Sequence, residues 1–313
     1  MKKWIALLLA AVTALGMFAG CSGSGSDTDE DDFDVSSFWA DITPGTFDDA
    51  TGALAEILES GVLTVALSPD FAPMEFVDTS KSGQDQYVGF DPMLAQYLAY
   101  YFGVELEIQA MGFETCQTAV YTANVPMAIS GFSVTPERAE QYELSDYYYA
   151  GENETEQVIL VLESNAEKYT SFADLAGLDV GAQVASLQMN LLTAQIPDAN
   201  PVTVADLGTG VLMLQNGEIE ALCVAKGNAT AIMASNSGLA IMEEQFEVSE
   251  EAENNVILIT KGETDLLDAV NEALAKAYAA GIYGEMYAYA QELAGLETAE
   301  EITIEEETLA AEE

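Results

Sequence analysis

The chain contains no histidine, and it has few basic residues and few cysteines. Its 313 residues include 8 Lys plus Arg against 54 Asp plus Glu, and three cysteines. Without histidine the chain lacks the usual general base, the serine and cysteine triads and the commonest metal ligand. Its strongly acidic surface repels a polyanion, which disfavours nucleic acid as a partner. These absences argue against most hydrolases and against nucleic-acid binding.

The three cysteines and the acidic residues form no pattern typical of a metal site. Cys21, Cys116 and Cys223 are too dispersed for a disulfide scaffold or a Cys-x-x-Cys site, and we expect Cys116 and Cys223 to be buried small apolar residues. No Asp-x-Asp-x-Asp-Gly loop with a distal glutamate is present, so the acidic excess indicates solubility rather than calcium binding. The sequence therefore predicts no cofactor and no metal.

Residues 1–20 have the order of charged, apolar and small residues that is typical of a secretory signal. Lys2 and Lys3 precede an apolar run over residues 4–18, and Cys21 follows the small residues 19–20. The placement of Cys21 resembles a bacterial lipobox, in which the cysteine is acylated and becomes the mature N-terminus. Such an anchor would hold the protein at the outer face of the cell membrane. The alternative is an uncleaved transmembrane segment, which also places the folded part outside the cytoplasm.

The segments on either side of the predicted folded part are polar and acidic. Residues 21–52 predict a flexible tether, because their Gly/Ser-rich and acidic start is too polar to fold alone. Residues 297–313 predict an acidic tail. Between them, apolar runs of strand length alternate with helical patterns, which predicts an α/β fold with mostly parallel sheets flanked by helices, and two sheets rather than one. The expected strands are 62–67, 104–108, 127–132, 179–183, 202–204, 219–224, 239–242 and 256–260, and the expected helices are 91–102, 186–196, 209–216, 263–280 and 283–294.

Arg138 is the single arginine of the chain, and it lies where a predicted strand gives way to a helix. Thr135 and Pro136 precede it as N-cap and first helical residue. Open α/β sheets bind ligands at the carboxyl ends of their strands, and an arginine there offers a planar fork suited to a carboxylate. The alternative is a surface arginine that pairs with Glu137 or Glu140.

The sequence around Arg138 resembles the signature of the bacterial family 3 extracellular solute-binding proteins, the polar amino-acid binders of ABC importers. The motifs that carry the resemblance are SGFSVTPER (130–138), YELSDYYY (142–149), GVLTV (61–65), FAPMEF (71–76), VGFD (88–91), FADLAGLDVG (172–181) and GIY (281–283). They extend over about residues 56–296. The resemblance strengthens the interpretation of Arg138 as a carboxylate ligand.

The resemblance implies the fold of a type II periplasmic binding protein, with two lobes joined by a hinge of two crossings. Residues 53–150 and 255–296 would form lobe 1, and residues 151–254 lobe 2. We expect the crossings near residues 151–157 and 251–255. A ligand that touches both lobes binds the closed form better and shifts the population toward it.

Carried over by position, the resemblance also implies the residues that bind the ligand. Phe71 would stack on the ligand and Phe113 would form a second aromatic wall, although either ring is equally compatible with a core position. Ser186, at a helix N-terminus in lobe 2, would meet the carboxylate from the other side, a role compatible with simple N-capping. The first-lobe turn would add Ser133 through its hydroxyl and N–H, Gly131 through its carbonyl, and Ser130.

The sequence departs from the family pattern at the position that binds the ammonium group of α-amino acids. Ala225 stands where such members carry an aspartate, and burying an ammonium without a carboxylate is costly. Pro126, Ala185 and Leu187 also differ from the usual residues, which puts ordinary α-amino-acid specificity in doubt. A replacement carboxylate would have to come from Asp70, Glu75 or Glu114.

These features predict a monomeric solute-binding lipoprotein that captures an amino acid or related small carboxylate and delivers it to an ABC importer permease. Ser68 stands where binders of cationic side chains often carry aspartate, which favours a neutral ligand. Two alternatives remain open. The first is an extracellular sensor for a membrane partner, and the second is a dehydratase-like enzyme on the same fold, in which carboxylates do the acid–base chemistry.

Overall fold

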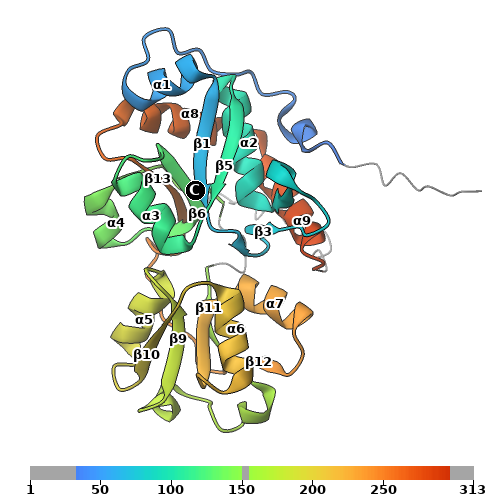
Figure 1. Ribbon diagram of the computed structural model, residues 1–313, viewed down its shortest axis with the longest axis vertical. Coiled ribbons are helices and arrows are strands. Elements are labelled where there is room, and N and C mark those ends of the chain that lie inside the picture. Colours follow the sequence, from blue (N-terminus) through green and yellow to red (C-terminus); the bar gives the residue numbers. More distant parts are fainter. Residues whose placement is uncertain (1–32, 150–154, 297–313) are drawn as a thin grey trace, which may run out of the picture. The chain divides into compact units, whose positions relative to one another are not determined.

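The computed structural model describes residues 33–149 and 155–296 (Figure 1). Its first sheet has the strand order β5-β1-β6-β13-β7, in which β1 pairs in parallel with β5 and β6, and β13 runs antiparallel to β6 and β7. The strands are β1 (Val62–Leu67), β5 (Glu105–Ala110), β6 (Met127–Ser133), β7 (Glu143–Leu144) and β13 (Asn255–Ile259). A small antiparallel sheet follows β1 in the chain and consists of β2 (Asp70–Phe71), β3 (Glu75–Val77) and β4 (Tyr87–Val88).

The second sheet has the strand order β10-β9-β11-β8-β12. β9 pairs in parallel with β10 and β11, whereas β8 runs antiparallel to β11 and β12. The strands are β8 (Gln157–Leu162), β9 (Asp179–Gln183), β10 (Asn200–Val204), β11 (Ala221–Ala225) and β12 (Leu239–Ile241). Both large sheets are therefore mixed, with the parallel pairs on one side of each sheet.

Helices pack against each large sheet, and together they define two lobes. The first lobe contains the first sheet with α1 (Gly52–Ser60), α2 (Phe90–Phe102), α3 (Phe113–Tyr121), α4 (Pro136–Gln141), α8 (Thr264–Ala280) and α9 (Ile282–Leu293). The second lobe contains the second sheet with α5 (Leu187–Gln195), α6 (Leu207–Asn216) and α7 (Lys226–Ser235). Short 3-10 helices are η1 (Val35–Trp39), η2 (Gly83–Gln86), η3 (Glu163–Asn165) and η4 (Phe172–Leu175).

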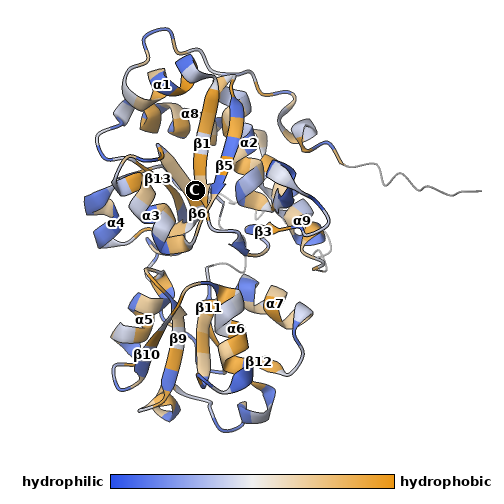
Figure 2. Cartoon of the chain, viewed as in Figure 1, coloured by the Kyte–Doolittle hydropathy of each residue, from blue (hydrophilic) through white to orange (hydrophobic). Residues whose placement is uncertain are grey.

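The strand β8 shows how the sequence builds the core of the second lobe. Val158 and Leu160 pack on one face of the sheet with residues of α6, while Ile159 and Val161 pack on the other face with residues of η4 and α5. This alternation follows from the two-residue period of a strand. Because both faces of each large sheet are covered, β1 and β11 are coloured mostly as hydrophobic in Figure 2, whereas the exposed residues of α4 are coloured as hydrophilic.

The predicted α/β class with two helix-flanked sheets is confirmed, and every expected strand and helix is present within a few residues of its expected ends. Several elements were not predicted. The edge strand β7 and the sheet β2-β3-β4 consist of strands of two or three residues, too short for a periodicity to show. The strand β8 lies beside the predicted hinge crossing, where an apolar run alone does not specify a strand.

The prediction that the tether extends to residue 52 is wrong for its last part. Trp39 is 3% exposed and packs near Tyr97 of α2, with 5.9 Å between the ring centroids. Ile42 is also buried, and the N–H of Gly45 donates to the carbonyl of Tyr101 at 3.0 Å. The segment is largely polar and acidic, which is typical of a tether. The burial of its few large apolar residues is nevertheless enough to fix it on the first lobe.

Several predictions fall on residues that lie outside the described ranges. These are the signal segment 1–20, Cys21, most of the first hinge crossing and the tail 297–313. Within residues 33–149 and 155–296, every helix is too short or too polar to cross a membrane. Cys116 and Cys223 are free and buried, as predicted.

Candidate functional site

A small cavity of about 20 Å³ lies between residues of the two lobes. Seven of the eight predicted ligand-binding residues line it, namely Phe71, Phe113, Ser130, Gly131, Ser133, Arg138 and Ser186. The remaining lining residues are Asp70, Gln157, Gln183, Leu187, Gln188 and Asn255. This volume is enough for about one water molecule. An amino acid therefore requires the lobes to move apart from this conformation before it can enter.

Arg138 is held in the cavity wall by the start of α4. The Thr135 side chain accepts a hydrogen bond from the Arg138 N–H at 3.2 Å, which confirms the predicted N-cap. The guanidinium donates to the Ser133 carbonyl at 2.7 Å, to Gln117 Oε1 at 3.2 Å and to the Ala185 carbonyl at 3.0 Å. The last of these bonds joins the first lobe to the second. A surface arginine paired with Glu137 or Glu140 is excluded, because Arg138 is 4% exposed.

Arg138 is a buried cation without a carboxylate partner. Burial lowers its pKa to about 10, so the group remains charged at neutral pH. Its Cζ atom lies 5.2 Å from the ring centroid of Phe132 and 5.5 Å from that of Phe113, contacts that favour the cation. No salt bridge within the described residues involves Arg138. The three hydrogen bonds use three of its five N–H groups, which leaves two for an anionic ligand.

The second lobe presents a helix N-terminus to the same cavity. Ser186 is the N-cap of α5, and its side chain accepts a hydrogen bond from the Met189 N–H at 3.1 Å. The predicted capping role is thus confirmed, while its ligand role stays a prediction. Ala185 precedes it with a φ of +59°, an uncommon angle for a residue other than glycine. This conformation accompanies the turn whose carbonyl accepts from Arg138.

Two aromatic rings and a glycine shape the first-lobe wall. Phe113 stacks on Phe132 with 4.9 Å between centroids, so it is both a cavity wall and a core contact. Gly131 has a φ of +54°, and a Cβ there would lie 3.1 Å from Cε1 of Phe71. Glycine is needed at this turn because it adopts the left-handed conformation and leaves room for the Phe71 ring.

Two fully buried carboxyl groups lie behind this wall. Ser130 Oγ donates to Glu75 Oε1 at 2.6 Å, while Asp91 Oδ2 accepts from the Gly131 N–H at 2.8 Å and from the Tyr148 hydroxyl at 3.1 Å. Burial raises the pKa of Glu75 well above its ordinary value and the pKa of Asp91 to about 7. The two carboxyl groups interact, and the hydrogen bonds that they accept from Ser130 and Gly131 hold this turn in place.

Ala225 is the predicted site residue that does not line the cavity. It ends β11, is 1% exposed, and pairs in register with Gln157, whose side chain does reach the cavity. Its methyl group carries no charge for an ammonium, and the predicted contact with the ligand stays a prediction. The position nevertheless lies beside the site.

Sequence reasoning missed the amide side chains around the cavity. Gln117 lies one helical turn after Phe113, and its side-chain oxygen accepts a hydrogen bond from the Arg138 Nε–H. Gln183 is the last residue of β9, at the carboxyl edge of the second sheet. Helical spacing and the strand-end rule are the signals that could have found them. Asn255 also lines the cavity, and its buried Nδ2 has no hydrogen-bond partner among the described residues. A donor of this kind suits a ligand oxygen.

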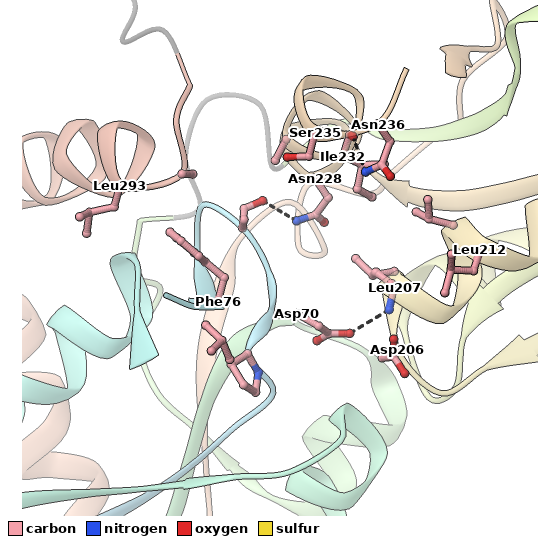
Figure 3. A pocket seen from close by; sticks show the side chains of 17 residues that line it. Asp70, Phe76, Asp206, Leu207, Leu212, Asn228, Ile232, Ser235, Asn236 and Leu293 are labelled. Carbon is pink, nitrogen blue, oxygen red and sulfur yellow. Dashed lines mark hydrogen bonds between the residues drawn. The ribbon is translucent and has the colours of Figure 1, made fainter. Parts of the chain in front are cut away.

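A second, larger cavity of about 550 Å³ adjoins the first at Asp70, which lines both (Figure 3). Its walls come from β2, β3, α6, α7 and the end of α9, and they are mostly apolar, with Leu212 and Val77 exposed. None of the eight predicted site residues lines it. Within the described part of the chain, no three Cys, Asp or Glu side chains are grouped so as to hold a metal ion.

Comparison with known proteins gives consistent matches. The family model described as bacterial extracellular solute-binding proteins, family 3, matches residues 63–290. An arginine-binding extracellular protein of Bacillus subtilis is 31% identical over 189 residues, which is 60% of this chain and 58% of that protein. This alignment therefore spans less than two thirds of that relative.

Solved structures extend the likeness to the whole fold. An amino acid ABC transporter substrate-binding protein of Streptococcus pneumoniae, bound to L-arginine, has a TM-score of 0.70 and 30% identity, and the match covers 80% of this chain and 100% of that chain. An ancestral amino-acid-binding protein, described as a precursor of cyclohexadienyl dehydratase, has a TM-score of 0.64 and 27% identity over 75% of this chain and 98% of its own.

The matches to amino-acid-binding proteins agree with the α/β lobes and with the position of Arg138, and they confirm the fold expected of a type II periplasmic binding protein. The matched residues 63–290 begin in β1 and end in α9, so they include both sheets and every residue of the cavity. The chain belongs to the bacterial extracellular solute-binding proteins, family 3.

Proposed function

We propose that this chain is a lipid-anchored, extracytoplasmic substrate-binding protein that captures an amino acid or a related small carboxylate and delivers it to an ABC importer. The observation that carries the proposal is the buried, unpaired guanidinium of Arg138 in a cavity lined by both lobes. A buried charge is normally paired, so the cavity requires an anionic guest. A carboxylate satisfies this requirement with two parallel hydrogen bonds.

Binding would couple the ligand to the closure of the lobes. The ligand carboxylate would accept hydrogen bonds from Arg138 on the first lobe and from the N-terminal N–H groups of α5 on the second. In the conformation described here, the Ala185 carbonyl accepts from Arg138. A ligand that contacts both lobes stabilises the closed state by its differential affinity for that state, and an importer recognises the resulting shape.

Acylation of Cys21 would tether the monomeric protein to the outer face of the membrane, beside the importer permease. The matched curated relatives are described as binding proteins, and no catalytic residue is proposed for this site. The carboxyl groups of Glu75 and Asp91 are fully buried behind the wall, where they touch the turn and not the guest. We therefore expect a bound ligand to be recovered unchanged.

The ligand is best identified by a thermal-shift screen of basic, neutral and acidic amino acids and simple carboxylates, followed by calorimetry. Arginine belongs in the panel because matched relatives bind it, and neutral amino acids belong there because position 68 is serine. Small-angle X-ray scattering with and without a saturating hit then tests closure. We expect a smaller radius of gyration with the ligand; a panel without a carboxylate hit would contradict the proposal.

A further inference from the structure

The cavity carries two charges of opposite sign, and neither has a counterion. Arg138 supplies the positive charge and Asp70 the negative one, and both residues line the cavity. No salt bridge within residues 33–149 and 155–296 involves either side chain. Both groups lose solvation by burial, which lowers the pKa of Arg138 and raises that of Asp70. A guest with one group of each sign would neutralise both.

Asp70 is the carboxylate that the structure places at the cavity. Glu75 lies behind the wall, where it accepts from the Ser130 hydroxyl and interacts with Asp91. Glu114 does not line the cavity, and Ala225 provides no charge. Of the three replacement carboxylates that the sequence allowed, only Asp70 has access to a guest.

The hydrogen bonds of Asp70 show how it meets the second lobe. Its Oδ1 accepts from the Ser68 hydroxyl at 2.9 Å, and its Oδ2 accepts from Gln183 Nε2 at 2.8 Å. The same Oδ2 accepts from the Leu207 N–H at 2.9 Å (Figure 3). Both Oδ2 donors are neutral and belong to the second lobe. Three donors leave part of the acceptor capacity of a carboxylate free, because an ionised carboxylate has about four acceptor sites.

The charges around Asp70 also favour a cation at this end of the cavity. The carboxylate of Asp206 acts on the same region and interacts electrostatically with Asp70. No lysine lines either cavity. A positive group beside Asp70 is therefore attracted by Asp206 as well as by Asp70 itself.

We propose that Asp70 binds the ammonium group of the ligand and takes the role that Ala225 cannot fill, so that this site selects zwitterionic amino acids over simple carboxylates. The inference rests on the proposed function, and it adds the recognition of the second charge. Once the lobes have moved apart to admit the ligand, Arg138 binds its carboxylate and Asp70 binds its ammonium group.

A different role for Asp70 is a plain bridge between the lobes through Gln183 and Leu207. A bridge helps closure around every ligand equally, whereas an ammonium ligand helps only those that carry an amine. The ratio of two affinities separates the roles. The matched pair is the amino acid with the best affinity in the panel and its desamino analogue, which has the same carboxylate and side chain and lacks the amine.

The test is calorimetry of this pair on the wild-type chain and on Asp70→Asn, with Asp268→Asn as the control. Asp268 is an exposed aspartate on α8, so the control loses the same charge away from the cavity. We expect Asp70→Asn to lower the affinity for the amino acid roughly 10- to 100-fold relative to the desamino analogue, since a charge-assisted pair is lost. Asp70→Glu, which keeps the charge, should retain the preference for the amino acid.

An equal loss for both ligands in Asp70→Asn, or no loss for either, would overturn the inference and leave the proposed function standing. A wild-type chain that binds the desamino analogue as tightly as the amino acid would overturn it as well. Failure of the wild-type chain to bind any carboxylate would overturn both. Circular dichroism checks that each variant is folded, and Asp70→Ser gives the same neutral comparison should Asp70→Asn not fold.

Discussion

Replacement of Arg138 with alanine removes the one guanidinium of the site together with three hydrogen bonds. The bonds to Ser133, Gln117 and Ala185 measure 2.7, 3.2 and 3.0 Å between heavy atoms. Their loss removes one donor from each of three acceptors and leaves the Ala185 carbonyl with only the Gln117 Nε2 donor at 3.3 Å across the lobes. The same change deletes the two N–H groups that we assign to the ligand carboxylate.

The expected loss of affinity follows from the burial of Arg138, which is 4% exposed. Truncation of one partner of a buried, hydrogen-bonded charge pair costs about 2–5 kcal/mol of binding free energy, which corresponds to a roughly 30- to 5,000-fold weaker Kd. An exposed pair would lose less than about 1 kcal/mol. A buried Arg138 and an exposed Arg138 therefore predict losses of affinity that do not overlap.

Isothermal titration calorimetry with the best carboxylate from the panel measures this loss, and thermal melts report whether the variant is folded. Lys168→Ala is the matched control, because it removes one exposed cation that contacts Tyr169. Arg138→Lys keeps the charge but not the planar fork, so we expect an intermediate affinity. A folded Arg138→Ala that binds within threefold of the wild-type chain would refute the reasoning.

Three further variants test other parts of the structure. Because burial raises the pKa of Glu75 well above its ordinary value and that of Asp91 to about 7, the folded protein keeps a proton that the unfolded chain loses above about pH 5. The free energy of unfolding should therefore fall as the pH rises through 7, by roughly 1.4 kcal/mol per pH unit for each such proton, and Glu75→Gln should flatten this slope in urea melts between pH 5 and 8; an unchanged slope would contradict the assignment. Ala225→Asp should strengthen the binding of amino acids specifically in calorimetry and, as an N-cap for α7, raise the stability by about 1 kcal/mol; unchanged affinity would mean that position 225 does not face the ligand. Gly89→Ala should cost at least about 1 kcal/mol in urea denaturation, because Gly89 has a φ of +119° and a Cβ would clash with the Met74 carbonyl, and a neutral result would contradict the strain.

The order of strands and helices could be predicted because the buried strands are apolar runs with clear ends. The six residues of β1 coincide with the prediction, since the apolar run is preceded by Gly61 and followed by Ser68 and Pro69. The five residues of β9 also coincide with the prediction. The segment near Trp39 could not be predicted. Its burial depends on a few apolar side chains within a polar stretch, chiefly Trp39 and Ile42, and only the shape of the first lobe decides whether they find a partner.

The residues of the candidate site that could be predicted are those at the ends of clearly recognisable strands and helices. Arg138, Ser133 and Ser186 lie at strand or helix ends with recognisable capping residues, so their positions at a common edge could be inferred. Asp70 and Gln183 line the cavity from different lobes, and Gln183 Nε2 donates a hydrogen bond to Asp70 Oδ2 at 2.8 Å. A contact of this kind depends on how two separate sheets meet, and neither periodicity nor spacing specifies it.

The central claim is that Arg138 binds the carboxylate of a ligand between the two lobes. A crystal structure of the chain with its tightest amino acid tests it most directly. We predict both carboxylate oxygens at about 3 Å from nitrogen atoms of the guanidinium, with the N-terminus of α5 on the other side. A ligand held in the larger cavity beside α6 and α7, with Arg138 still bonded to the Ala185 carbonyl, would contradict the account.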